Sequence, residues 1–247
     1  MKGLWKLTWT EIKLFLRDPY AAFFTLVFPL MMLFLFGSIY GNKPSPLLGG
    51  YGSVDVSLPA YTAMIIATSG IVSLPISLAS YRERGILRRF RATPLHPLAI
   101  LIAEVIVIFI ATILGMALLI IAGKLFYDLH FFGNPINVLA AFILSSFSFF
   151  AIGFVLASII PNARTTQIVS MVIFYPMLFL SGAGIPRQLL PKIIQKYSQV
   201  LPLTHVVTLL QGLWFGESWR EHLMEVRILI AILIIGIILS SRIFRWE

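Results

Sequence analysis

The sequence predicts an all-α polytopic membrane protein with six membrane-spanning helices. Its 247 residues are 59% hydrophobic and only 12% charged, whereas a soluble domain carries about 25% charged residues. The apolar residues gather into six long runs, and about 20 apolar residues are enough to cross the ~30 Å hydrocarbon core of a bilayer. Basic segments separate several of these runs, as expected of loops on the cytosolic side of a membrane.

The charge, cysteine and histidine contents exclude several kinds of function. The net charge of +9 does not indicate nucleic-acid binding, because the basic residues lie in short segments between apolar runs. The sequence has no cysteine, which excludes disulfides and thiol chemistry, and its four histidines have no metal-ligand spacing. It also contains no P-loop, zinc-protease or hydrolase motif. We therefore expect a chain that is not an enzyme and that binds no cofactor or metal.

Residues 1–18 predict an amphipathic helix that lies in the membrane interface. Basic residues recur at helical spacing, and an apolar stripe with two tryptophans runs beside them: Lys2, Lys6, Lys13 and Arg17, then Trp5, Trp9, Ile12 and Leu16. Such a helix places its tryptophan rings at headgroup depth, and its lysine stems extend along the apolar surface. Asp18-Pro19 then ends the helix and turns the chain into the membrane.

Six segments are the predicted spans: 20–40, 58–80, 97–123, 136–160, 165–183 and 226–241. We expect a kink near Pro75 in the second span, because an interior proline breaks the hydrogen-bond ladder of a helix. The last run is short between Arg227 and Arg242, and snorkelling of both side chains to the interfaces lengthens it.

The basic segment 81–96 sets the expected orientation. It carries five arginines, and each arginine at the bilayer centre costs roughly 2.5–3.5 kcal/mol, so the segment cannot lie in hydrocarbon. The two short loops expected outside hold only Lys43 and Lys124, whereas most of the 19 Lys and Arg lie in the expected cytosolic segments. We therefore expect a multi-pass protein of the plasma (inner) membrane with both termini in the cytoplasm.

The same basic segment is patterned as a docking helix. Three arginines recur at helical spacing: Arg84, Arg88 and Arg91. An apolar patch lies on another side and consists of Ile86, Leu87 and Phe90. A short helix with an apolar patch and a basic rim suits a partner protein. A loop that only sets topology is the alternative, and it leaves the apolar patch without a role.

Segment 185–225 predicts two short helices that enter the outer leaflet and return without crossing. Its apolar pieces are interrupted by Pro186, Pro191 and Pro202. Irregular backbone at this depth is tolerated only against protein or a water-filled cavity. We therefore expect a re-entrant segment before the last span.

Glu104 is the one acidic residue inside a predicted span. An intramembrane carboxylate is a candidate proton relay or substrate contact. Its position near the start of span 97–123 also allows a structural role, in which water or an arginine of segment 81–96 meets the carboxylate. Both interpretations stay open at this point, as does a proton-coupled secondary transporter that uses Glu104.

Two spaced motifs resemble a known family of transporters. The basic segment reads R-E-x-G-x-L-x-R-x-x-x-T-P-L from Arg82 to Leu95, and resembles the loop after the second span in permeases of type-2 ABC exporters. A second motif resembles the C-terminal signature of that family: Ser181-Gly182-Ala183, Leu190-Pro191, Pro202-Leu203-Thr204-His205 and Gln211. Many members carry arginine where this chain has Gln211, which is a departure from the pattern. The resemblance covers essentially all 247 residues.

The resemblance implies a transmembrane permease subunit without an ATPase of its own. It implies two permease chains, expected as a homodimer in membrane lipid, and two copies of a separate ABC ATPase subunit that uses ATP and Mg²⁺. The residues implied in ATPase coupling are Arg82, Glu83, Arg84, Gly85, Leu87, Arg88, Arg89, Phe90 and Arg91. Those implied in the re-entrant exit gate are Pro191, Pro202, Leu203, Thr204, His205 and Gln211.

The compact chain, with no large external domain, is most similar to the drug and antibiotic efflux branch, which implies export of a hydrophobic or amphipathic substrate. The same fold also exports polysaccharides and lipid-linked glycans, and this alternative stays open.

Overall fold

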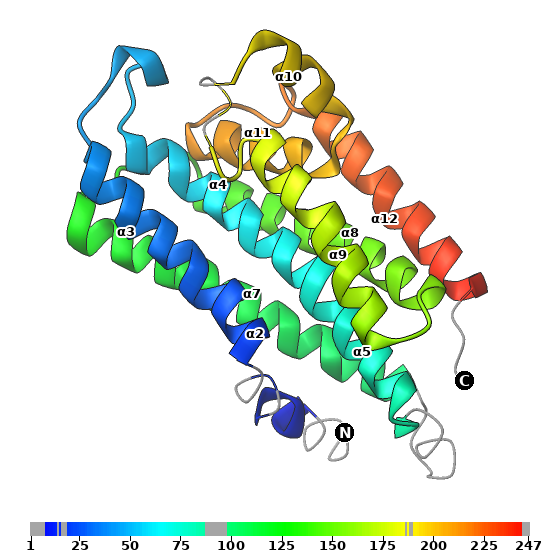
Figure 1. Cartoon of the computed structure of the whole chain (residues 1–247). Helices are drawn as coiled ribbons and strands as arrows, with labels where there is room; N and C mark the ends of the chain where they lie inside the picture. The colour runs from blue at the N-terminus through cyan, green and yellow to red at the C-terminus, as the bar shows by residue number, and fades with distance from the viewer. Residues whose placement is uncertain are drawn as a thin grey trace.

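The computed structural model describes residues 8–13, 15, 19–86, 98–185, 187 and 190–243. All the regular secondary structure of these residues is helical, and six of the helices are long and apolar enough to cross a membrane. The predicted fold class, including its six spans, is thereby confirmed. The six helices lie side by side in one bundle, and a short N-terminal helix (residues 8–13) lies at one end of it (Figure 1).

The first two membrane-length helices each contain an internal π-helical turn. The first comprises α2 (Pro19–Ala22), η1 (Phe23–Val27) and α3 (Phe28–Tyr40), and the second comprises α4 (Ser53–Ala67), η3 (Thr68–Ser73) and α5 (Leu74–Glu83). The other four are α7 (Leu98–Tyr127), α8 (Pro135–Ile159), α9 (Ala163–Leu180) and α12 (Leu223–Ile243). Several extend beyond the predicted spans, because a helix continues into polar flanks that hydropathy no longer marks.

Prolines explain both π-helical turns. Pro29 follows η1 and Pro75 follows η3, and a proline has no N–H for the normal helical ladder. In each case the residue before the proline donates to the carbonyl five residues back: Phe28 to Phe23, and Leu74 to Ser69. The expected irregularity near Pro75 therefore takes the form of a widened turn. The two turns pack against each other.

The second helix is the centre of the bundle. Within its most apolar stretch 83% of the residues are buried, against 11% for α12. Two close approaches hold α8 between this helix and α12. A Cβ placed on Gly153 would collide with the carbonyl oxygen of Gly70 in η3, and a Cβ on Gly236 in α12 would lie 2.7 Å from the Ala151 Cβ. Small residues let the helix backbones touch, as in other membrane bundles.

The two ends of the bundle carry different structures (Figure 1). One end, called the terminal end here, holds the N-terminal helix, the last turn of α5, the α8–α9 turn and the end of α12. The opposite end holds α10 (Lys192–Tyr197), η5 (Ser198–Val200) and α11 (Pro202–Trp214), together with the segment 41–52. The α11 helix packs against α4, α8, α9 and α12. Whether α10 and α11 form a re-entrant pair stays a prediction.

Candidate functional site: the last turn of the second helix

The last turn of α5 is held by the turn between α8 and α9. The Arg82 guanidinium donates to the carbonyl oxygen of Ala157 at 2.9 Å and to that of Ile160, which follows α8. Glu83 accepts a hydrogen bond from the Ala163 N–H at 3.1 Å, at the start of α9. A cation at the C-terminus of one helix and an anion at the N-terminus of the next each match the helix dipole.

Gly85 ends this helix for a local reason. Its φ is +65°, in the left-handed region that glycine adopts most readily, and its N–H donates to the Arg82 carbonyl oxygen at 3.0 Å. Arg84 lies beside it with an exposed side chain. The other residues expected in ATPase coupling lie outside the described residues: Leu87, Arg88, Arg89, Phe90 and Arg91.

Tyr81 joins two carboxyl groups that are far apart in sequence. Its hydroxyl contacts Oε2 of Glu11, in the N-terminal helix, and lies 3.1 Å from Oε2 of Glu104, in α7. Within the described residues, the Glu104 carboxyl therefore has the Tyr81 hydroxyl as its hydrogen-bond partner. The loop arginines Arg88, Arg89 and Arg91 lie outside the described residues, so the two interpretations of Glu104 stay open. We call Glu11, Tyr81 and Glu104 the carboxyl cluster.

Burial of the Glu11 side chain changes the pKa of its carboxyl group. Glu11 is only 8% exposed and Glu104 only 6%. Burial raises the pKa of the Glu11 carboxyl above its ordinary value of 4.5, and the hydrogen bond with Tyr81 offsets part of that rise. The folded chain therefore favours the protonated form of the Glu11 carboxyl more than the unfolded chain does.

A cavity of about 500 Å³ opens beside the carboxyl cluster, and we call it the carboxyl pocket. Apolar side chains line part of its wall, among them Phe15, Ile76 and Ile108, and the three cluster residues line another part. Ser73, in the π-helical turn η3, also lines it. The Ser73 hydroxyl is buried and makes no hydrogen bond within the described residues.

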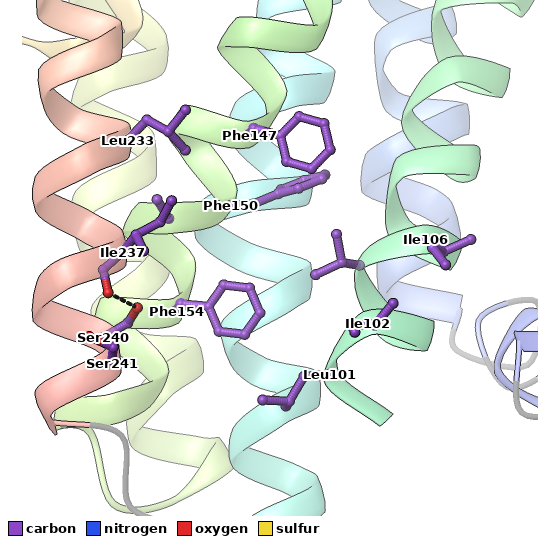
Figure 2. A pocket seen from close by; sticks show the side chains of 12 residues that line it. Leu101, Ile102, Ile106, Phe147, Phe150, Phe154, Leu233, Ile237, Ser240 and Ser241 are labelled. Atoms are coloured by element: carbon purple, nitrogen blue, oxygen red, sulfur yellow. Dashed lines mark hydrogen bonds between the residues drawn. The ribbon is translucent and has the colours of Figure 1, made fainter. Parts of the chain in front are cut away.

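A second cavity of about 700 Å³ has a different character. It lies between α7, α8 and α12, and its walls are almost entirely apolar, as Figure 2 shows with Phe150 and Ile237. The two serines at its edge, Ser240 and Ser241, donate to carbonyl oxygens of their own helix. This cavity therefore suits hydrocarbon, and the described residues of its lining include no charged group.

The expected exit-gate residues come together at the opposite end of the bundle. Pro202 begins α11, and Leu203 is fully buried. Thr204 donates to the Ser198 carbonyl oxygen at 2.5 Å, and the His205 ring nitrogen lies 2.9 Å from the Gln199 carbonyl oxygen.

The two other expected gate residues lie in α11 and directly before α10. Gln211 donates to the Val56 carbonyl oxygen in α4 at 3.0 Å, so it joins α11 to the central helix. Pro191 precedes α10, and its carbonyl oxygen accepts from the Gln195 N–H.

Sequence reasoning found Glu104 but missed Glu11, Tyr81 and Ser73. Glu11 had a signal, because it is the one acidic residue among the first 17. Ser73 had none, since a serine in an apolar helix is unremarkable until its neighbours are known.

The chain is similar to one family of transporters and to several permeases. The family described as "ABC-2 type transporter" matches residues 2–215. The chain is 24% identical to the "Putative transport permease YvfS" of Bacillus subtilis (strain 168), covering 99% of this chain and 98% of that protein. It is 23% identical to the "Daunorubicin resistance ABC transporter permease protein DrrB1" of Streptomyces coeruleorubidus, and the match covers 78% of this chain and 66% of that protein.

A third relative matches over a shorter region. The chain is 24% identical to "Nodulation protein J" of Rhizobium leguminosarum bv. viciae, covering 55% of this chain and 51% of that protein, so it spans about half the length of that relative. The family match, in contrast, extends over most of the chain. The chain therefore belongs to the ABC-2 type transporter family.

Proposed function

We propose that this chain is the permease subunit of an ATP-driven exporter in the plasma membrane. The observation that carries the proposal is its membership of the ABC-2 type transporter family, and the six membrane-length helices agree with it. Two permease chains form the pathway, and two copies of a separate ABC ATPase supply the energy. The 247 residues contain no P-loop, so ATP and Mg²⁺ are assigned to that partner.

The last turn of the second helix is the proposed point of coupling. Three consecutive residues reach different elements: Tyr81 contacts the N-terminal helix and α7, Arg82 contacts the end of α8, and Glu83 contacts the start of α9. A force applied to the basic segment 81–96 would therefore reach several elements at once. The second helix itself is the most buried of the six, which supports a role in carrying this movement through the bundle.

The proposed exit gate is the α10–α11 assembly. The bond between Gln211 and the Val56 carbonyl oxygen ties α11 to the central helix, so movement of that helix would displace α11. We propose that both termini and the basic segment are cytosolic and that α10 and α11 face the outside. The mechanism is alternating access or opening of this outer gate, driven by closure of the ATPase pair.

We propose a hydrophobic or amphipathic substrate, such as a drug, antibiotic or lipid-like molecule. One relative carries the printed name of a daunorubicin resistance permease, which supports this class.

The decisive experiment is co-purification with candidate ABC ATPases, followed by reconstitution in vesicles. We expect ATP-dependent export and ATP hydrolysis that the substrate stimulates. Export that needs no ATPase and stops when a protonophore is added would overturn the proposal in favour of a secondary transporter using Glu104.

A matched pair of variants tests the docking helix. Burying Leu87 and Phe90 against a partner would contribute roughly 1.5–3 kcal/mol each, whereas an exposed arginine contributes about 0–1 kcal/mol. Leu87→Ala with Phe90→Ala should therefore reduce ATPase recovery strongly, and Arg88→Ala should do so only slightly and less at high salt. Wild-type recovery and transport in the double variant would refute docking through this patch.

A further inference from the structure

The carboxyl cluster has more hydrogen-bond acceptors than donors. Tyr81 has one hydroxyl proton but contacts both Glu11 and Glu104, so it can donate to only one of them at a time. The two carboxyl groups together carry four acceptor oxygens, and both glutamates are buried. Such a site is completed by a group that brings several donors and a positive charge.

Ser73 is an independent indication that the pocket holds a ligand. It lies on a different turn from the carboxyl cluster, is only 9% exposed, and its hydroxyl has no hydrogen-bond partner within the described residues. Buried polar groups are nearly always hydrogen-bonded, so an unpartnered hydroxyl that lines a cavity calls for a missing partner.

The other walls of the carboxyl pocket indicate the polarity and size of the rest of the ligand. Apolar side chains such as Phe15, Ile76 and Ile108 contact the cavity. Its volume of about 500 Å³ is within the usual range of about 300–1,000 Å³ for small-molecule sites. Among the described residues of the lining, Arg84 is the one basic residue, and its side chain is exposed, so water screens its charge.

We propose that the carboxyl pocket binds a lipophilic amine through its ammonium group. An –NH₃⁺ group carries three donors and no acceptor, which matches Glu11, Glu104 and the Ser73 hydroxyl. Any proton that the Glu11 carboxyl holds leaves to solvent when both carboxyl groups ionise around the cation. The apolar body of the amine lies along Phe15, Ile76 and Ile108. That the bound amine is also exported rests on the proposed function above.

Binding to the purified chain without an ATPase tests the site separately from export. The probe is 1-naphthylmethylamine, and its matched neutral control is 1-naphthylmethanol, which has the same ring but no charge. We expect the amine to bind about tenfold or more tightly than the alcohol, because charged hydrogen bonds are the stronger ones. Equal affinity for both probes would overturn the proposal, whether or not the chain exports anything with an ATPase.

Variants locate the binding site. Glu104→Gln should weaken amine binding about tenfold or more while leaving alcohol binding unchanged, and Tyr81→Phe provides a second test if Glu104→Gln fails to fold. Ser73→Ala should weaken amine binding about threefold or more. Ser170→Ala is the matched control, because the buried Ser170 hydroxyl also has no partner among the described residues but does not line the pocket. Unaltered amine affinity in folded Glu104→Gln, or an equal loss in Ser170→Ala, would place the amine elsewhere.

Discussion

Arg82 and Ile160 are joined by a hydrogen bond from the arginine guanidinium to the carbonyl oxygen that follows α8. The same guanidinium also donates to Ala157, so one side chain satisfies two carbonyl groups at a helix C-terminus, where carbonyls have no partner within the helix. Arg82 was expected from the family resemblance to contact an ATPase. Its contacts within the chain give it a second task, which is to hold the α8–α9 turn.

Arg82→Ala should therefore destabilise the bundle. The loss of charge-assisted hydrogen bonds to Ala157 and Ile160 should lower the free energy of unfolding by about 1.5–3 kcal/mol. Arg82→Lys should recover only part of this, because an ammonium does not reproduce the planar fork of a guanidinium. Thermal unfolding in detergent measures the effect. Arg84→Ala, which removes an exposed arginine of the same turn, is the control, and an equal loss there would contradict the prediction.

Gly153→Ala should separate two helices. A Cβ at this position would collide with the Gly70 carbonyl oxygen, and backbone atoms cannot rotate away as a side chain can. We expect a loss of about 1–3 kcal/mol or more in the free energy of unfolding. The control is Ala140→Val, which adds methyl groups at an exposed position of the same helix. If both variants unfold alike in detergent, the close contact is not important for stability.

Docking of the N-terminal helix should weaken as the pH rises. Burial raises the pKa of Glu11 above 4.5, so the folded state favours the protonated carboxyl. The contribution of Glu11 to docking of the N-terminal helix is therefore fully present below pH 4.5. It is lost as the pH rises through the raised pKa of Glu11. Among the described residues that line the pocket with Glu11, the other titratable or charged groups are Tyr81, Glu104 and the exposed Arg84.

Hydrogen exchange of residues 8–13, corrected for the intrinsic pH dependence of exchange, measures this docking. Protection should be highest in acid. Glu11→Gln should remove most of the pH dependence, because an amide keeps hydrogen bonds but does not ionise. Protection that increases with pH in the wild type would show that the sign is wrong.

The topology can be tested cleanly because the chain has no cysteine. Single cysteines at Lys43, Lys124 and Lys192 should react with an impermeant reagent from outside, and cysteines at Arg89 and at both termini should react from inside. Segment 41–52 and α10 lie at the end of the bundle opposite the N-terminal helix (Figure 1). Position 192 reacting only from the cytosolic side would refute the proposed orientation.

The sequence by itself determined the number and type of the membrane helices. Hydropathic length is a local property, because each apolar run has to cross the same hydrocarbon thickness whatever its neighbours are. The end of α5 at Gly85 was not predicted, because the left-handed conformation of this glycine is known only from the structure. Pro75 predicted an irregular second helix, although its form as a π-helical turn was not predictable.

Only the tertiary structure decided the partners of the polar side chains. Glu11 and Tyr81 are 70 positions apart, Arg82 and Ala157 are 75 apart, and Gln211 and Val56 are 155 apart. Helical periodicity predicts which residues share a face but not which helix that face meets. Those pairings depend on how the whole bundle packs, and close approaches such as that of Gly70 to Gly153 set this packing. For this reason Glu104 could be recognised from the sequence as unusual, while the carboxyl cluster and its pocket could not.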